Sequence, residues 1–154
     1  MANPTLEGKV GNNATIVSGS NLNALASGSL VLSAAFSNVN GDAAGEGYRY
    51  AVAKLHIDSM AVSAGGVVDG GFLRASDGSV YEQGGTSVTP NRPPDFVFTP
   101  VVQTAAIDLE QVVSVPVCAT IKCLLRNNAL GATTPANTNG YLKLFYDTDM
   151  YPSI

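Results

Sequence analysis

Apolar and polar residues alternate in two stretches near the end of the chain, and this pattern predicts β-strands. In residues 119–128, Ile121 and Cys123 fall on one face of an extended chain, whereas a lysine and an arginine fall on the other. Residues 141–146 repeat the alternation. A period of two is typical of a strand with one face in a core. We expect the two strands and the polar loop between them to form a β-hairpin.

The same pattern predicts strands through most of the chain. They are expected at residues 14–17, 30–36, 48–58, 67–75, 79–83, 96–99 and 104–110. The inward positions are expected at Leu30, Leu32, Ala34 and Phe36 of the second segment and at Ala51, Ala53, Leu55 and Ile57 of the third. A helical turn can occupy residues 22–26, and a helix is the competing prediction for residues 104–113, because Ala, Leu, Glu and Gln tolerate one.

Turn residues divide these strands. The sequence Ser76-Asp77-Gly78 favours a tight turn, which predicts a second hairpin between residues 67–75 and 79–83. Residues 84–95 contain three prolines, which lack the N–H that a central strand needs, so this segment is expected to cross the surface. Residues 1–13 have little to bury and are expected to form an N-terminal arm that precedes one domain at residues 14–154.

These elements favour an all-β fold. About eight or nine short strands, separated by Gly, Pro and Asn turns and without a strong helix, are typical of an antiparallel β-sandwich. We expect this sandwich to be jelly-roll-like. A chain of 154 residues is long enough to bury a core of its own as a single domain.

Composition excludes several classes of partner. The chain has a net charge of −4, and its eight basic residues are scattered, so we expect no nucleic-acid partner. The apolar runs are too short or too interrupted to span a membrane, and residues 1–7 do not have the pattern of a signal peptide. We therefore expect synthesis in a cytoplasm. Only 13% of residues are charged, and this low fraction suits a surface that packs in an assembly.

Residues with catalytic chemistry are scarce. His56, the single histidine, is predicted on the face of Lys54 and Asp58, where a solvated or interface imidazole is the ordinary interpretation. Asp108 and Glu110 fall on one strand face. Such a pair can serve glycoside hydrolysis or calcium binding, but a polar outer face is the simpler reading. We expect no enzymatic activity, cofactor or metal.

Two other chemical features have ordinary interpretations as well. Asp147 and Asp149 form a second carboxylate pair with the same spacing, again read as a polar outer face. Cys118 and Cys123 are five residues apart, which in a strand places them on opposite faces and about 16 Å from each other. A disulfide between them is therefore not expected, and Cys123 is predicted in the core.

A series of short motifs carries a resemblance to a known group of proteins. In order, they are Leu25-Ala26-Ser27-Gly28-Ser29, Ala34-Ala35-Phe36, Ala75-Ser76-Asp77-Gly78-Ser79-Val80-Tyr81, Leu124-Leu125-Arg126-Asn127-Asn128 and Tyr141-Leu142-Lys143-Leu144. Over residues 22–146 this order resembles small β-rich structural proteins of tailed bacteriophages. The resemblance implies a virion component, a capsid decoration or cement protein that is often trimeric and binds the major capsid protein on the capsid exterior.

Such a protein needs contact residues rather than catalytic ones. We expect these contacts in the arm, the proline-rich loop and the C-terminal tail, at Thr5, Leu6, Lys9, Val10, Arg92, Pro93, Pro94, Tyr151 and Ile154. A second hypothesis is a carbohydrate-binding jelly-roll module of a phage tail fibre, which uses exposed tyrosines and the carboxylate pairs. A third is a hydrolase, which requires His56 beside both a carboxylate and a serine in a cleft.

Overall fold

The structure, a computed structural model, describes residues 10–37, 50–75, 79–82, 89–116, 120–131, 134 and 140–147. Within them the chain forms β1 (Val10–Val17), a single helical turn α1 (Gly19–Leu22), β2 (Leu30–Leu32), β3 (Tyr50–Ile57), β4 (Val67–Arg74), β5 (Phe96–Phe98), β6 (Ile107–Ser114), β7 (Ile121–Asn128) and β8 (Tyr141–Asp147). The all-β prediction is confirmed. The competing helix at residues 104–113 is wrong, because β6 occupies most of that segment.

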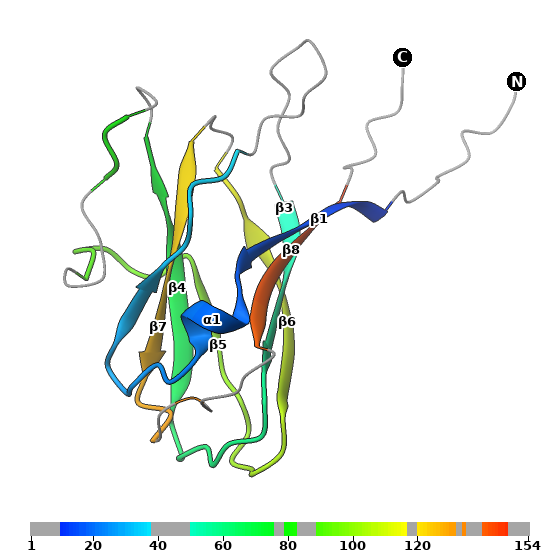
Figure 1. Cartoon of the computed structure of the whole chain (residues 1–154), viewed down its shortest axis with the longest axis vertical. Helices are drawn as coiled ribbons and strands as arrows, with labels where there is room; N and C mark the ends of the chain where they lie inside the picture. The colour runs from blue at the N-terminus through cyan, green and yellow to red at the C-terminus, as the bar shows by residue number, and fades with distance from the viewer. Residues whose placement is uncertain are drawn as a thin grey trace, which may run out of the picture.

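The strands form two four-stranded sheets that face each other (Figure 1). One sheet has the order β1-β8-β3-β6 and the other has the order β2-β7-β4-β5. Every pairing between these strands is antiparallel. The predicted antiparallel β-sandwich is therefore confirmed.

The pairing is nested from the ends of the chain toward its middle. Strand β1 pairs with β8, β2 with β7, β3 with β6 and β4 with β5. The predicted C-terminal hairpin is wrong, because β7 and β8 lie in different sheets. The predicted strand at residues 79–83 is not formed over residues 79–82, although Glu82 makes one backbone hydrogen bond to Arg74, and its turn at residues 76–78 lies outside the described residues. Alternation determines which face of a strand is buried, but it does not select the neighbouring strand.

The core lies between the sheets and is built by the inward faces of both. In β3 the predicted inward residues are confirmed, since Ala51, Ala53, Leu55 and Ile57 are all buried. The largest fully buried side chains are Phe72, Phe96, Leu22, Leu55, Ile57, Leu73, Ile107, Ile121, Leu125, Leu130, Leu142 and Leu144. Most of them belong to one contiguous cluster, so the two sheets share a single hydrophobic core.

Strand β2 differs from its prediction in the phase of its alternation. Val31 packs against the core, whereas Leu30 and Leu32 are half-buried on the other face. After β2 the Ser33 hydroxyl accepts the backbone N–H of Cys123 at 2.8 Å, in place of a backbone carbonyl. Pairing with β7 resumes at Phe36, which again packs against the core. The irregular residues between Leu32 and Phe36 thus shift the alternation by one position, so that the Phe36 side chain points toward the core.

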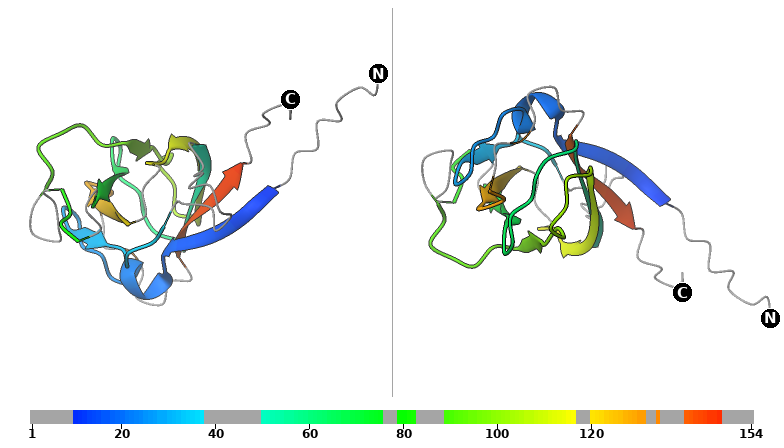
Figure 2. Two further views of the ribbon diagram at one scale, coloured as in Figure 1. Left: turned by 90° about the horizontal axis from the view of Figure 1, so that it is seen from above. Right: turned by 90° about the horizontal axis from the view of Figure 1, so that it is seen from below.

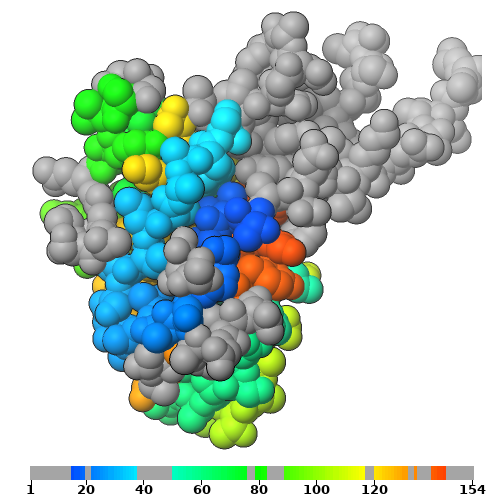
Figure 3. All heavy atoms as spheres, in the orientation of Figure 1, coloured from blue at the N-terminus to red at the C-terminus, as the bar shows by residue number. Residues whose placement is uncertain are grey.

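The connection between β1 and β2 closes one side of the sandwich. It crosses from one sheet to the other and covers part of the face shown in Figure 3. Buried Asn127 donates from Nδ2 to the Leu25 carbonyl at 2.9 Å and accepts the Leu130 N–H at 3.2 Å. The Thr134 hydroxyl donates to the Leu22 carbonyl and accepts the Leu25 N–H at 2.7 Å. These bonds satisfy backbone groups that would otherwise be buried without partners.

The two ends of the described chain lie together. Val10 is paired with Asp147, and Figure 2 shows β1 and β8 extending side by side beyond the other strands. The strand begins four residues before the predicted start at residue 14, so Val10 and the next three residues belong to β1 and not to an arm. The remainder of the predicted arm, residues 1–9, lies outside the described residues.

Candidate functional site

The proline-rich segment at residues 89–95 lies along the outer face of the β2-β7-β4-β5 sheet. Together they enclose a pocket of about 40 Å³. Its lining consists of Leu30, Asp69, Gly70, Gly71, Thr89, Pro90, Arg92, Pro93, Pro94, Leu124 and Arg126. This placement confirms for residues 89–95 that the predicted segment crosses the surface, whereas residues 84–88 lie outside the described residues. It brings three of the predicted contact residues, Arg92, Pro93 and Pro94, to one site.

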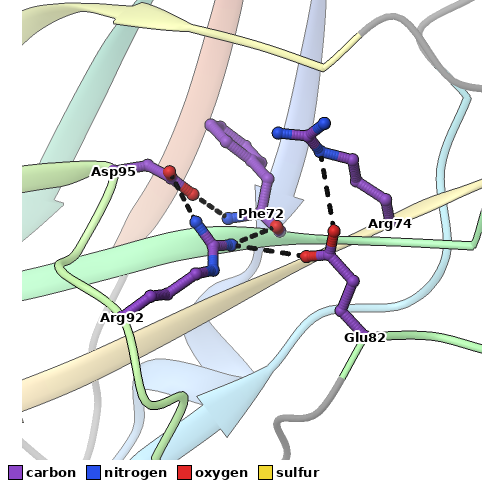
Figure 4. Close-up of polar contacts among 5 residues, drawn as sticks. All are labelled: Phe72, Arg74, Glu82, Arg92 and Asp95. Atoms are coloured by element: carbon purple, nitrogen blue, oxygen red, sulfur yellow. Dashed lines mark hydrogen bonds and ion pairs between the residues drawn. The ribbon is translucent and has the colours of Figure 1, made fainter.

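The segment also protects an exposed edge of β4. Strand β5 pairs with β4 only between Val68 and Gly70, so the backbone of Phe72 lies beyond its reach. Asp95 supplies the acceptor for this part of the β4 edge, because its Oδ2 accepts the Phe72 N–H at 2.6 Å (Figure 4). Arg92 donates from Nη2 to the Phe72 carbonyl at 2.6 Å and from Nη1 to Asp95 at 2.8 Å. Two side chains thus replace a strand at this edge.

Glu82 extends this cluster outward. Its Oε2 lies 3.7 Å from Nη2 of Arg92, and its Oε1 lies 3.9 Å from Nε of Arg74 (Figure 4). Its backbone N–H donates to the Arg74 carbonyl at 2.9 Å. The two ion pairs are longer than hydrogen bonds and solvent-exposed, so they contribute little to stability. Arg92 is therefore held mainly by Asp95 and Phe72.

An ion pair contributes to the lining of the pocket. Asp69 of β4 accepts two hydrogen bonds from Arg126 of β7, at 2.9 Å from Nε and 2.6 Å from Nη2. Asn128 donates a third to the same carboxylate at 2.8 Å. The hydrogen bond to Asp69 is the main cause that raises the pKa of Arg126 above its ordinary value. Asp69 is largely buried, so these three donors compensate a carboxylate charge that is mostly removed from water.

This chemistry suits a small apolar group from another chain. The lining includes three prolines and two leucines, and the charges of Asp69 and Arg126 already satisfy each other. The volume accommodates no more than a few water molecules or the tip of one side chain. We therefore interpret the pocket as a place where an extended segment can insert a side chain, rather than as a cofactor site.

The outer face of the β1-β8-β3-β6 sheet holds His56. Its Nδ1 lies 2.8 Å from Oδ1 of Asp108, and its Nε2 lies 3.5 Å from Oδ1 of Asp58. The imidazole stacks on Tyr141 with ring centroids 5.4 Å apart, and Nζ of Lys143 lies 4.4 Å from the centroid of the same tyrosine ring. Both imidazole nitrogens thus face carboxylates, and no serine of the described chain is hydrogen-bonded to them.

The two carboxylates predicted on one face of β6 lie there, and each is paired with a basic side chain or an imidazole of β3. Asp108 and Glu110 share the outer face, as expected from their spacing. Glu110 lies 3.1 Å from Nζ of Lys54, whose pKa this contact raises, and Asp108 contacts His56. The two carboxylates therefore bind different partners instead of converging on one ligand. The second pair, Asp147 and Asp149, lies outside the residues whose side chains are described.

The predicted contact residues do not form one surface. Arg92, Pro93 and Pro94 lie on the outer face of one sheet, whereas Val10 begins β1 in the other. Thr5, Leu6, Lys9, Tyr151 and Ile154 lie outside the described residues.

Sequence reasoning missed Asp69, Asp95, Arg126 and Asn128 as members of the site. The alternation in β7 does place Arg126 on the outer face. The pair could not be found from the sequence, because only the register between β4 and β7 shows that Arg126 lies opposite Asp69.

Cys123 is buried in the core as predicted, and burial raises the pKa of its thiol. Cys118 lies outside the described residues. Across the described ranges, no three or more His, Cys, Asp or Glu side chains gather in a way that could hold a metal ion. Within the same ranges, no helix is long and apolar enough to cross a membrane.

Comparison with known proteins yields no relative. No protein-family model, curated protein or solved structure matches this chain.

Proposed function

We propose that this protein is a structural component of a virus particle, a decoration or cement protein that binds the outside of a capsid shell. The nested pairing of eight strands, β1 with β8 through β4 with β5, carries the proposal. This pairing supports a jelly roll, an architecture found in viral capsid and lectin domains. The support is an analogy of fold, because one fold can host several functions.

The described surfaces suit a protein that acts by contact. The pocket beneath residues 89–95 has the size and apolar walls to receive one side chain from a neighbouring chain. Val102 and Val101, in the loop before β6, are more than two-thirds exposed. When many copies attach to one shell, modest contacts of this kind combine into firm attachment. The major capsid protein is the partner that this function requires.

The ends of the domain supply a further contact region. Because Val10 and Asp147 are paired, the first residue of β1 and the last residue of β8 lie at one corner of the domain. Predicted contact residues from both ends of the chain are therefore attached to the same corner. A protein fixed to a shell through this corner would present its two sheets to solvent or to adjacent copies.

Co-sedimentation with capsid shells of the same virus tests the proposal. We expect the full chain to pellet with the shells at a fixed ratio, and a variant that lacks residues 1–9 to stay in the supernatant. The truncation stops before β1, so the variant should retain the circular dichroism spectrum and melting temperature of the full chain. Failure of the full chain to bind shells would refute the proposal. Specific binding on a glycan array would favour the carbohydrate-binding alternative.

A further inference from the structure

Strand β6 forms an edge of the β1-β8-β3-β6 sheet. It pairs with β3 over its whole length, from Ile107 opposite Ile57 to Ser114 opposite Tyr50, without a register shift. No other strand of the described chain lies on its far side. An edge of eight regularly paired residues presents a row of backbone donors and acceptors to a further strand.

The β6 edge lacks the protection found on the other sheet. On β4, Asp95 and Arg92 cover the backbone of Phe72. The β6 sequence Ile-Asp-Leu-Glu-Gln-Val-Val-Ser contains no proline, lysine or arginine, which are the residues that commonly block an edge. Its two acidic side chains are paired with residues of β3 on the same sheet face, Glu110 with Lys54 and Asp108 with His56.

A buried polar atom marks the middle of this strand. Oε1 of Gln111 is inaccessible to solvent and has no hydrogen-bond partner among the described residues. A buried acceptor without a donor is unfavourable, and such groups are rare in folded proteins. The terminal torsion of glutamine is broad, so this amide can turn toward a donor on an added strand. Gln111 shares the core-facing side of β6 with Leu109 and Val113, and its acceptor would gain a partner if a second glutamine amide lay beside it across the edge.

The sequence of β6 selects one register for pairing with itself. Directly opposed residues of a sheet share a face, so a two-fold axis must pass through a residue of the strand. An axis at Leu109 places Asp108 opposite Glu110, and an axis at Glu110 places that residue opposite itself. Both arrangements set like charges against each other, which is unfavourable.

An axis at Gln111 avoids both problems. It places Glu110 opposite Val112, and it sets the two Gln111 side chains opposite each other, where their amides can exchange hydrogen bonds. Residues 108–114 of each strand then pair, whereas an axis at Val112 leaves only residues 110–114 paired. The register at Gln111 is therefore the longest one that has no like charges directly opposed.

We propose that a second copy of this chain pairs antiparallel with β6 about a two-fold axis at Gln111, so that the two four-stranded sheets join into one. The interface is isologous, as is usual for symmetric dimers. It predicts a dimer in solution, in contrast to the trimer that the resemblance implies. The proposal concerns contact between copies and does not depend on the place of the protein in a virion.

Substitutions at Val112 test both the edge and the register. Val112 is 67% exposed, so a charged side chain there should leave the fold of each copy intact. In the proposed register V112E faces Glu110 of the second copy twice per dimer, and V112K forms two opposite-charge pairs instead. From the energies of such pairs, V112E should weaken dimerisation roughly two- to thirtyfold and V112K should strengthen it by a similar factor.

Sedimentation equilibrium over a range of concentrations measures these constants with the full chain. V80E is the matched control, because Val80 is 70% exposed and lies outside β6, and it should dimerise as the wild type does. A wild-type monomer or trimer would overturn the proposal. Equal dimerisation of V112E and V112K would overturn it as well, since this register requires them to differ in sign. Slower hydrogen exchange at residues 107–114 in the dimer would support it independently.

Discussion

Asp69 of β4 and Arg126 of β7 lie directly opposite each other and form a two-bond ion pair on the outer face of their sheet. The two residues are 57 positions apart in the sequence. Their side chains differ in burial, since 8% of Asp69 and 29% of Arg126 is exposed. The carboxylate thus depends on its partner more than the guanidinium does, because an unpaired charge costs more where water is excluded.

This difference predicts unequal effects of breaking the pair. Arg126→Ala leaves the Asp69 charge buried with one remaining donor, Asn128, and should lower the free energy of unfolding by about 3 kcal/mol. Asp69→Ala leaves a partly hydrated arginine and should cost about 1–2 kcal/mol. Urea denaturation measures both. Equal losses, or a larger loss for Asp69→Ala, would contradict the burial argument.

The clamp on the edge of β4 gives a second prediction. Asp95→Ala removes the acceptor of the Phe72 N–H and one partner of Arg92, so it should reduce the free energy of unfolding by about 1–2 kcal/mol. It also uncovers the strand edge and should increase aggregation measured by light scattering. Glu82→Ala is the control, since its contacts are long and exposed, and it should change stability by less than about 0.5 kcal/mol.

Adjacent glycines in β4 should respond differently to alanine. A Cβ at Gly70 would lie 2.5 Å from the Leu124 carbonyl oxygen and 2.6 Å from the Phe96 ring, both fixed in the packed sandwich. A Cβ at Gly71 would lie 2.9 Å from Oδ2 of Asp95, a side-chain atom that can shift by a few tenths of an ångström if its hydrogen bond to the Phe72 N–H lengthens. Gly70→Ala should therefore cost about 1–3 kcal/mol by overpacking, and Gly71→Ala should cost less. Thermal melts of the two variants compare them, and the reverse order would refute the packing argument.

The thiol of Cys123 predicts a dependence of stability on pH. Burial raises its pKa in the folded state, so the folded protein keeps the proton while the unfolded chain loses it above pH about 8.5. The unfolded state then binds fewer protons, and the free energy of unfolding should fall by up to about 1.4 kcal/mol per pH unit. In a Cys118→Ser background, urea titrations between pH 8 and pH 9.5 should show this fall for Cys123 but a smaller one for Cys123→Ala. Identical pH dependence of the free energy of unfolding in the two proteins would show that the Cys123 thiol does not cause the fall.

Local alternation was enough to locate most strands. It gave the inward residues of β3 correctly and placed Cys123 in the core. It also put His56, Asp108 and Glu110 on outer faces, because the direction of a side chain in a strand follows from its position in a period of two. In β2 it failed, since the hydroxyl of Ser33 interrupts the ladder and changes the phase before Phe36.

Only the tertiary structure decided which strands are neighbours. A strand can pair through its backbone with any other strand, so the sequence near β7 and β8 could not show that they belong to different sheets. For the same reason, the sequence did not reveal the pairing of Asp69 with Arg126 or the role of Asp95 at the β4 edge. The sequence by itself determined a β-sandwich whose strands bury alternate residues, because the alternation of apolar and polar positions is a local property of each strand. The nested pairing and the pocket came from the packing of distant segments around a shared core, where contacts between residues far apart in the chain outweigh local preference.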